Sequence, residues 1–450
     1  MQLQDVHNAY FIGIGGIGMS ALARYFRHMG KNVSGYDRTA TPITDELTVM
    51  GVSIHFEAEV DLIPKPCKES KHTLVVYTPA ISEEHQELRY FRQNGFVIKK
   101  RSEVLGIVTK DTFCLAVAGT HGKTTTSCIL AHLLKGAGAA FIAFLGGISE
   151  DFRSNFIFRG SEYAVVEADE YDRSFLQLYP DVACITSMDA DHLDIYQTDE
   201  QLKKSFFDFT HNIKTGGKLI IRNGLEMNGI TFGIEDASDF CITNIKIEHG
   251  TYIFDLKTPE TTHFSVRFNK PGRHNLLNGL AAFAMAVSAG FPPHRLVEAL
   301  ATFKGVQRRF SYQVKEKNLV FIDDYAHHPT EIDAVYDAII EMHPGLKITA
   351  VFQPHLYSRT RDFVEEFAVS LAKFDMVLLL DIYPAREKPI PGVTSTWLLQ
   401  RIANPNKRLV DKSNLIDEIR HSDPEVLVTM GAGDIGLEVS KIKKELAYAS

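Results

Sequence analysis

One short loop constrains the fold of this chain more than any other feature of its sequence. The apolar residues 113–117 predict a buried strand, and residues 123–135 predict a helix. Between the strand and the helix, and into its first turn, the sequence reads Gly119-Thr120-His121-Gly122-Lys123-Thr124-Thr125. A glycine turn at this position brings backbone amides and the positive end of the helix dipole to one point. The loop therefore predicts an α/β fold with a phosphate-binding site.

Two side chains of this loop indicate a nucleoside triphosphate with magnesium. Lys123 can reach the β- and γ-phosphates, and the Thr124 hydroxyl can bind Mg²⁺. The loop departs from the full Walker pattern, because Val117 stands where the first glycine is expected. The alternative is an ordinary strand-to-helix turn that contains Lys and Thr, but a strand, two glycines, Lys-Thr and a helix in this order argue against it. We therefore expect ATP at residues 119–125.

Polar side chains at the ends of neighbouring strands indicate metal ligands. One predicted strand ends at Glu167, and the next is followed by His192. The carboxyl ends of parallel strands share one edge of the sheet, so both side chains are expected near the phosphates. Glu167 is the expected magnesium ligand, with Asp169, Glu170 and Asp172 as nearby alternatives. His192 is a candidate ligand of a second metal ion, although a lone histidine is more often structural.

A second glycine-rich turn lies near the N-terminus. Gly13, Gly15, Gly16 and Gly18 follow an apolar strand with the spacing G-x-G-x-x-G, and Asp37 stands at the end of the next strand. This pattern is typical of a βαβ unit that binds the diphosphate of a nucleotide. NAD is the default ligand of this pattern, but nucleotide sugars also contain a diphosphate. A separate ATP loop elsewhere in the chain argues against an enzyme that transfers hydride. The turn therefore predicts a nucleotide diphosphate and no more.

Further polar groups stand at a predicted helix start and at the end of the central segment. Asn275 and Asn278 share one face of a helix and suit contact with a base or a carboxylate. Helix capping by asparagine explains them equally well. Arg309 can neutralise phosphate charge or can be an ordinary surface cation.

The last third of the chain holds another group of ionisable residues. A predicted strand runs into Asp324 and His327, and the density of charge there is hard to explain by packing. Arg359 follows a later strand and is a candidate to bind a substrate carboxylate.

The order of strands and helices predicts three α/β domains. Short apolar runs alternate with helical periodicity, which is typical of βαβ units and parallel sheets. We expect a Rossmann-like domain at residues 1–107, a P-loop ATPase-like domain at 108–312 and a second Rossmann-like domain at 313–450. Between residues 239 and 268 the apolar period changes to two, which predicts an antiparallel hairpin added to the central sheet.

Composition narrows the class of protein. The formal net charge is −8 and no long basic run occurs, so nucleic acid is not an expected partner. No apolar run reaches 18 residues, so we expect no membrane span. The five cysteines form no CxxC pair, and the N-terminus lacks the basic region of a signal peptide. These features predict a cytoplasmic protein with reduced thiols.

The combination of these segments resembles the Mur ligases of peptidoglycan synthesis, and most closely the members that add L-alanine. The resemblance covers nearly the whole chain, and the order of the motifs is specific. It rests on residues 13–20, 119–126, 167–172, 191–194, 274–278, 323–331, 352–362, 383–392 and 431–435.

This resemblance implies an ATP-driven, amide-forming ligase. Its N-terminal domain would bind UDP-N-acetylmuramate, its central domain ATP with two Mg²⁺ ions, and its C-terminal domain L-alanine. The γ-phosphate would pass to the lactoyl carboxylate of the sugar, and the amino group of alanine would then displace phosphate from the acyl phosphate.

The resemblance also implies a role for each candidate residue. The catalytic residues would be Lys123, Glu167, His192, Arg309 and Asp324, and the metal ligands Thr124, Glu167 and His192. The ATP site would comprise Gly119, Thr120, His121, Gly122, Lys123, Thr124, Thr125, Asn275, Asn278, Arg309 and Asp324. The UDP-sugar site would comprise Gly13, Gly15, Gly16, Gly18 and Asp37, whereas His327 and Arg359 would hold the alanine.

Two features depart from the family pattern, and a third concerns a lysine that the alanine-adding members generally do without. Tyr171 stands where many of them have serine, and this tyrosine also occurs in the related ligase that recycles murein tripeptide. Leu356 stands where some members have arginine, so binding of the alanine carboxylate would rest on Arg359. Lys203 and Lys204 lie near the position of a carbamylated lysine in related ligases, and neither is assigned that role. The tripeptide ligase is the alternative function; a nucleotide-dependent oxidoreductase or a P-loop regulator is a remote one.

Overall fold

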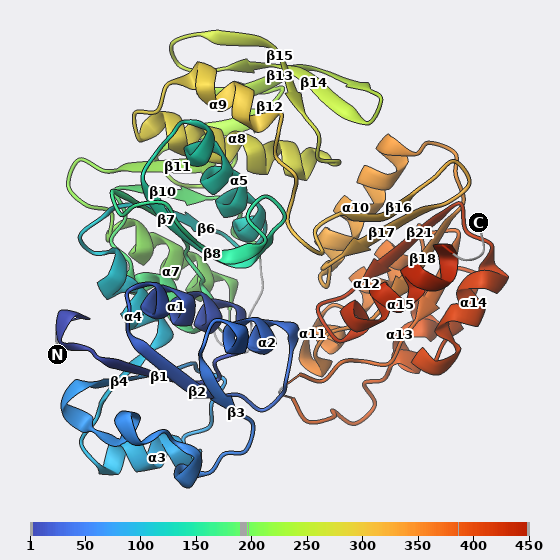
Figure 1. Cartoon of the computed structure of the whole chain (residues 1–450). Coiled ribbons are helices and arrows are strands. Elements are labelled where there is room, and N and C mark those ends of the chain that lie inside the picture. Colours follow the sequence, from blue (N-terminus) through green and yellow to red (C-terminus); the bar gives the residue numbers. More distant parts are fainter. Residues whose placement is uncertain (1–2, 190–195, 197, 386, 448–450) are drawn as a thin grey trace. The chain divides into compact units, whose positions relative to one another are not determined.

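The structure is a computed structural model that describes residues 3–189, 196, 198–385 and 387–447. The chain divides into two compact units (Figure 1). The first comprises Met1–Ile245, Phe254–Arg267 and Leu277–Phe303, and the second comprises Lys246–Ile253, Phe268–Leu276 and Lys304–Ser450.

The N-terminal sheet has five parallel strands in the order β3-β2-β1-β4-β5. The strands are β1 (Asn8–Ile12), β2 (Asn32–Tyr36), β3 (Ser53–His55), β4 (Thr73–Tyr77) and β5 (Val97–Lys100). The helices are α1 (Ile17–His28), α2 (Pro42–Val49), α3 (Gln86–Gln93) and α4 (Arg101–Thr109). Successive residues of β1 face opposite sides, because Phe11 packs on Phe26 of α1 and Tyr10 packs on Phe91 of α3. Both faces of the sheet are therefore covered by helices, as Figure 1 shows.

The strand order of this sheet places a crevice beside the glycine turn. From β1 the chain first adds strands on one side, β2 and β3, and then continues with β4 on the other side. Ligands of doubly wound sheets bind at such a switch point, at the carboxyl ends of the strands. The turn after β1 contains the predicted diphosphate site.

The central sheet has ten strands in the order β15-β14-β13-β12-β11-β10-β6-β9-β7-β8. The strands are β6 (Phe113–Ala118), β7 (Phe141–Ser149), β8 (Ser154–Phe158), β9 (Tyr163–Glu167), β10 (Val182–Ile185), β11 (Lys218–Arg222), β12 (Ile230–Ile234), β13 (Phe240–Glu248), β14 (Thr251–Lys257) and β15 (Thr262–Phe268). The helices are α5 (Lys123–Gly136), α7 (Asp199–Thr210), α8 (Arg273–Ser288) and α9 (Pro293–Leu300). β6 pairs in parallel with both β9 and β10, so the carboxyl ends of all three strands meet at the phosphate loop.

The expected hairpin follows the parallel part of the central sheet. β13 and β14 are neighbours joined by His249 and Gly250, whose φ angles are 51° and 74°. A two-residue turn with positive φ at both positions has the type I′ form that matches the twist of a hairpin.

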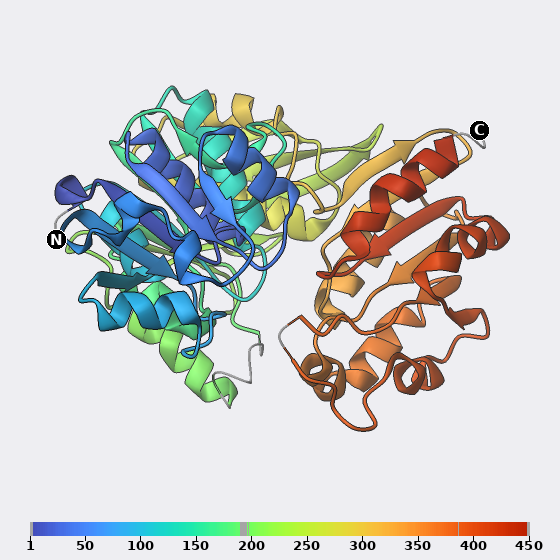
Figure 2. The same ribbon diagram turned by 60° about the horizontal axis from the view of Figure 1, so that its bottom comes forward.

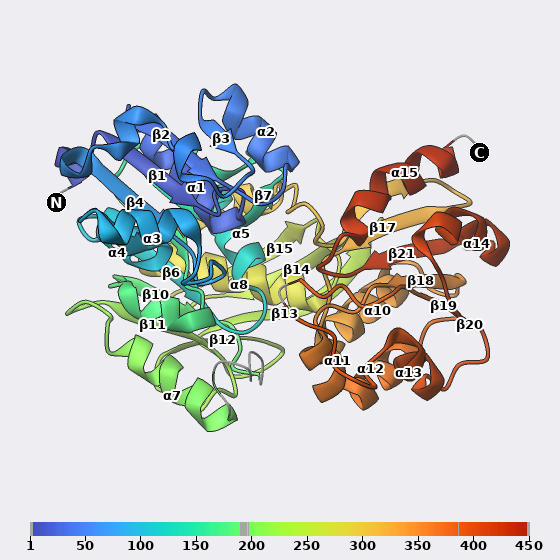
Figure 3. The same cartoon turned by 90° about the horizontal axis from the view of Figure 1, so that it is seen from below.

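The C-terminal sheet has six strands in the order β16-β17-β21-β18-β19-β20, and only β16 is antiparallel to its neighbour. The strands are β16 (Ser311–Lys315), β17 (Val320–Asp324), β18 (Ile348–Phe352), β19 (Met376–Leu379), β20 (Lys407–Leu409) and β21 (Val426–Met430). The helices are α10 (Pro329–Met342), α11 (Tyr357–Asp362), α12 (Val364–Leu371), α13 (Ser395–Arg401), α14 (Leu415–Ser422) and α15 (Ile435–Ala447). One face packs against α10, α12 and α13, and the other against α14 and α15 (Figures 2 and 3).

These three sheets confirm the predicted fold class of three α/β domains with mainly parallel strands. The exact domain boundaries stay predictions. Among the described residues, no helix has both the length and the apolar composition that crossing a bilayer requires.

Candidate active site

The phosphate loop depends on two glycines. Gly119 and Gly122 have φ angles of 129° and 84°, a region that residues with side chains rarely adopt. A Cβ on Gly119 would lie 2.2 Å from Thr186 Oγ1, and a Cβ on Gly122 would lie 2.3 Å from Asn278 Oδ1. The glycines therefore permit both the backbone conformation and the close packing of the loop.

The segment directly after β10 forms hydrogen bonds with the phosphate loop. Thr120 N–H donates to the Ser187 carbonyl at 3.2 Å, and His121 N–H donates to Ser187 Oγ at 2.9 Å. The Thr186 hydroxyl donates to the Ala118 carbonyl at 3.1 Å. Neither Thr186 nor Ser187 was predicted to matter. The signal in the sequence was a pair of hydroxyl residues directly after a buried strand.

Lys123 is held by a buried carboxylate. Its Nζ donates to Glu170 Oε1 at 2.8 Å and to the Gly119 carbonyl at 2.7 Å, and the Glu170 side chain is fully buried. Burial alone would lower the pKa of Lys123, but the charges of Glu170, Asp169 and Glu167 outweigh it, so the pKa is raised above its ordinary value. Lys123 is therefore a cation at the head of α5. Glu170, an alternative metal ligand in the sequence, is its ion-pair partner in the structure.

Thr124 and Glu167 have the geometry of neighbouring metal ligands. Thr124 Oγ1 lies 3.0 Å from Glu167 Oε2 and donates a hydrogen bond to this carboxylate. Two adjacent ligands of an octahedral Mg²⁺, each about 2.1 Å from the ion, lie about 3.0 Å apart. Gly146 of β7 leaves room for the carboxylate, because a Cβ there would lie 2.0 Å from Glu167 Oε2. Both residues therefore fit the predicted Mg²⁺.

The second predicted metal ligand, His192, lies outside the described residues. Within the part of the chain that the structure describes, no group of three or more His, Cys, Asp or Glu side chains could hold a metal ion. Mg²⁺ commonly takes part of its coordination from phosphate oxygens and water, so the pair Thr124 and Glu167 suits it.

The two asparagines of α8 have different surroundings. Thr126 Oγ1 donates to Asn278 Oδ1 at 3.3 Å, so Asn278 lies beside the phosphate loop. The Asn275 amide donates to the Pro271 carbonyl at 2.6 Å. Asn278 therefore lies where an ATP-binding residue is expected, whereas Asn275, inside the first turn of α8, ties the helix to the segment before it.

The N-terminal glycine turn is closed by the predicted acidic residue. Gly13 has a φ of 88°, and Gly15 N–H donates to Asp37 Oδ2 at 2.7 Å. Gly16 precedes α1, so the turn lies at the N-terminus of that helix. Asp37 therefore shapes the turn that is expected to receive the diphosphate.

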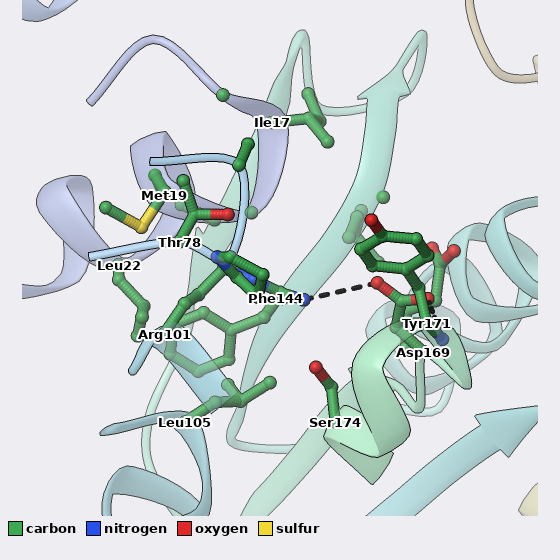
Figure 4. A pocket seen from close by; sticks show the side chains of 18 residues that line it. Ile17, Met19, Leu22, Thr78, Arg101, Leu105, Phe144, Asp169, Tyr171 and Ser174 are labelled. Atoms are coloured by element: carbon green, nitrogen blue, oxygen red, sulfur yellow. Dashed lines mark hydrogen bonds and ion pairs between the residues drawn. The ribbon is translucent and has the colours of Figure 1, made fainter. Parts of the chain in front are cut away.

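A pocket of about 340 Å³ is lined both by this turn and by the edge predicted to bind metal. Its lining includes Gly16, Ile17 and Gly18 from the turn and Glu167 and Asp169 from the end of β9 and the segment after it. In Figure 4 the Arg101 and Asp169 side chains point toward one another across the pocket and form an ion pair of 3.2 Å. The predicted diphosphate site and the predicted metal site thus open into one cavity within the first unit.

In the second unit, Asp324 is buried at the end of β17. Its carboxylate accepts N–H bonds from Phe310 at 2.6 Å and from Ala326 at 2.7 Å. Burial raises its pKa to about 6, although the Arg309 charge and these two amides act in the opposite direction. Arg309 lies over the Tyr325 ring, 5.1 Å from its centroid. Asp324 therefore organises the strand-end loop that also positions Arg309.

His327 and Arg359 come together through His355. The rings of His327 and His355 are 5.9 Å apart, and Arg359 Nη1 lies 3.5 Å from His355 Nδ1. The backbone N–H of His327 donates to Glu331 Oε2 at 2.9 Å, which fixes the start of α10. The predicted amino-acid site therefore forms one cluster in this unit, and His355 is a member that was not predicted.

We expect Asp324 to make the stability of the protein depend on pH. The pKa of its carboxyl rises from an ordinary 3.8 to about 6 on folding, so the folded protein binds the proton more tightly. The contribution of Asp324 to the free energy of unfolding is therefore greatest below about pH 4 and falls by about 3 kcal/mol as pH rises through 6. Urea unfolding of the wild type and Asp324→Asn between pH 4 and 7 measures this difference. A difference that does not vary with pH would contradict the expectation.

Family models match almost the whole chain. The Mur ligase family catalytic domain matches residues 8–112, the Mur ligase middle domain 117–286, and the Mur ligase glutamate ligase domain 308–433. The chain belongs to the Mur ligase family. The predicted family is thereby confirmed.

Named relatives within the family are similar over their full length. The UDP-N-acetylmuramate–L-alanine ligase of Flavobacterium psychrophilum is 57% identical over 446 residues, which are 99% of each chain. The ligase of the same name from Christiangramia forsetii is 56% identical over 447 residues, again 99% of each chain.

Solved structures share the fold. The UDP-N-acetylmuramate–alanine ligase of Thermotoga maritima has a TM-score of 0.84 and 27% identity, covering 98% of this chain and all of that one. A murein peptide ligase of Psychrobacter arcticus has a TM-score of 0.70 and 23% identity, covering 98% of each chain, and it shows the fold alone.

Proposed function

We propose that this protein joins L-alanine to the lactoyl carboxylate of UDP-N-acetylmuramate and converts ATP to ADP and phosphate. The pocket that runs from Gly16 and Gly18 to Glu167 carries this proposal. A nucleotide diphosphate at the glycine turn would extend its sugar acid toward Lys123 and the metal ligands. The names of the relatives, which are 57% and 56% identical, support the same reaction.

In the first step a carboxylate oxygen of the sugar attacks the γ-phosphorus, and the bond to the β-phosphate oxygen breaks, which gives an acyl phosphate and ADP. Lys123 stabilises the charge of the transferring phosphoryl group, and this requires Nζ to exchange Glu170 for phosphate oxygens. Thr124, Glu167 and, for a second ion, His192 would hold Mg²⁺, which offsets charge on the phosphates. Asn278, Asn275 and the remaining loop residues are assigned to ATP.

In the second step the amino group of L-alanine attacks the acyl carbon, and inorganic phosphate leaves. The second unit supplies the residues that we assign to this substrate and to the nucleotide. His327 and Arg359 are assigned to L-alanine, because a guanidinium pairs with a carboxylate through two hydrogen bonds. Arg309 and Asp324 are assigned to the nucleotide. ATP, a nucleotide sugar and five buried cysteines that form no disulfide are consistent with a cytoplasmic protein.

The alternative is a ligase that adds a whole tripeptide to the same sugar. Tyr171, the residue shared with such ligases, lines the pocket. The relatives named UDP-N-acetylmuramate–L-alanine ligase are 57% and 56% identical to this chain over 99% of its length. These comparisons favour L-alanine.

A phosphate-release assay distinguishes the two substrates. ATP, Mg²⁺ and UDP-N-acetylmuramate are supplied with L-alanine, glycine, L-serine or the tripeptide L-alanyl-γ-D-glutamyl-meso-diaminopimelate, and the product is identified by mass spectrometry. The proposal predicts the fastest phosphate release, with amide product, for L-alanine. Turnover with the tripeptide alone would overturn it in favour of the alternative.

A further inference from the structure

Arg101 is the one basic side chain among the described residues that line the pocket. The same walls carry the carboxylates of Glu167 and Asp169. A sugar nucleotide that enters this pocket brings a diphosphate and a carboxylate. Because like charges repel strongly at short range, the cation of Arg101 is needed to balance at least one of these anions.

The Arg101 guanidinium lies between Gly18 of α1 and Asp169, which follows β9. Arg101 is the first residue of α4, and its Nη2 donates to Asp169 Oδ2 at 3.2 Å. Its Nη1 lies 2.8 Å from the position that a Cβ on Gly18 would occupy, so the guanidinium touches the first turn of α1. Figure 4 shows the side chain reaching across the pocket toward Asp169.

Most of the hydrogen-bonding capacity of Arg101 is unused by the described part of the protein. A guanidinium has five N–H donors, and the contact with Asp169 accounts for one of them. The Arg101 side chain is only 18% exposed, so its other donors are largely sheltered from bulk water beside the pocket. Asp169 is 34% exposed, and water can therefore solvate its carboxylate when the ion pair opens.

We propose that Arg101 binds the diphosphate of the sugar nucleotide and releases Asp169 when it does so. The planar guanidinium can form hydrogen bonds with two phosphate oxygens. The backbone N–H groups and the helix dipole at the N-terminus of α1 attract the same anion. Arg101 is then a substrate-binding residue of the pocket. The identity of the diphosphate as part of UDP-N-acetylmuramate rests on the proposed function.

The neighbouring Lys100 offers a matched control. Its Nζ forms an ion pair of 2.8 Å with Asp172, so it joins the same two segments of the chain as Arg101 does. Lys100 does not line the pocket. Replacing it removes one positive charge and one ion pair without removing a donor from the pocket.

Calorimetric titration with UDP-N-acetylmuramate, without ATP, tests the proposal on the full-length wild type, Arg101→Gln, Asp169→Asn and Lys100→Gln. Loss of a charge-assisted pair predicts that Arg101→Gln raises the Kd by about tenfold to a hundredfold. Asp169→Asn frees the guanidinium, so its Kd is expected to equal or fall below that of the wild type. Lys100→Gln is expected to stay within about twofold.

Weaker binding in Arg101→Gln together with unchanged or tighter binding in Asp169→Asn is the decisive result, because a purely structural ion pair would weaken binding equally from either side. An ATP analogue titrated into Arg101→Gln should bind as it does to the wild type, which shows that the fold is intact. Equal losses in both variants, or no loss in Arg101→Gln, would overturn the role of Arg101. A wild-type protein that binds no UDP-N-acetylmuramate would overturn the proposed function itself.

Discussion

Replacing Lys123 with alanine is expected to lower the rate of phosphate release by at least about a thousandfold, because the transferring phosphoryl group loses its nearest fixed cation. Binding of UDP-N-acetylmuramate should be retained, because the glycine turn assigned to it lies between β1 and α1, away from Lys123 in the sequence. The change also leaves the carboxylate of Glu170 buried without the partner that now lies 2.7 Å away. Breaking a buried pair in this way costs about 3–5 kcal/mol of stability.

The double variant Lys123→Ala, Glu170→Gln separates these two effects. It replaces the buried carboxylate that has lost Lys123 with a neutral amide, so its unfolding free energy should recover most of the loss seen in Lys123→Ala. Its phosphate release should stay as low as that of the single variant. Recovery of turnover in the double variant would show that Lys123 acts only by neutralising Glu170.

The second large effect is expected for Glu167→Gln. An amide is a weaker ligand for Mg²⁺ than a carboxylate, and the lost charge faces the phosphates directly. We expect kcat to fall at least about a hundredfold and the Mg²⁺ concentration for half-maximal rate to rise about tenfold. Phosphate release measured over a range of Mg²⁺ concentrations gives both values.

Glu162→Gln is the matched control for this substitution. Glu162 is exposed and immediately precedes β9, whereas Glu167 ends the same strand. The control should keep the kcat and the Mg²⁺ dependence of the wild type. A Glu167→Gln protein with a reduced kcat but an unchanged Mg²⁺ dependence would contradict the assignment of Glu167 as a metal ligand.

The arrangement of the phosphate loop could be predicted, because the carboxyl ends of parallel strands lie at the same edge of a sheet. The order strand, Gly119, Gly122-Lys123-Thr124, helix fixes a loop at the carboxyl edge of a sheet, and Glu167 ends the neighbouring strand. Parallel pairing of β6 and β9 then leaves Thr124 and Glu167 3.0 Å apart. This contact was predictable because the register pairs Val117 with Glu167, and the short glycine loop then returns the start of α5 to the same edge of the sheet.

The sequence did not predict which of the neighbouring acidic residues would form an ion pair with which lysine. The segment from Glu167 to Asp172 holds four carboxylates, counting both ends, and their directions depend on backbone turns. Asp172 and Arg173 both have φ near 53°, which no rule for non-glycine residues anticipates. This turn sets which acid meets Lys123 and which meets Lys100.

The sequence also did not predict contacts between residues that lie far apart in the chain. Arg101 begins a helix and resembles an ordinary surface cation until the fold brings it to Asp169, 68 residues later. Asp324 is assigned to the nucleotide, and the sequence did not indicate that both of its oxygens also accept backbone N–H bonds. Residue type predicted an anion at that point but not which donors surround it.

Transfer of labelled oxygen tests the proposed carboxylate activation most directly. UDP-N-acetylmuramate carrying ¹⁸O in its lactoyl carboxylate is turned over with ATP, Mg²⁺ and L-alanine, and the released phosphate is analysed by mass spectrometry. An acyl phosphate keeps one carboxylate oxygen on the phosphorus when the amine displaces it. The proposal therefore predicts one ¹⁸O atom in each phosphate released from doubly labelled substrate. Phosphate without ¹⁸O would contradict it, because the γ-phosphoryl group would then have been transferred to water.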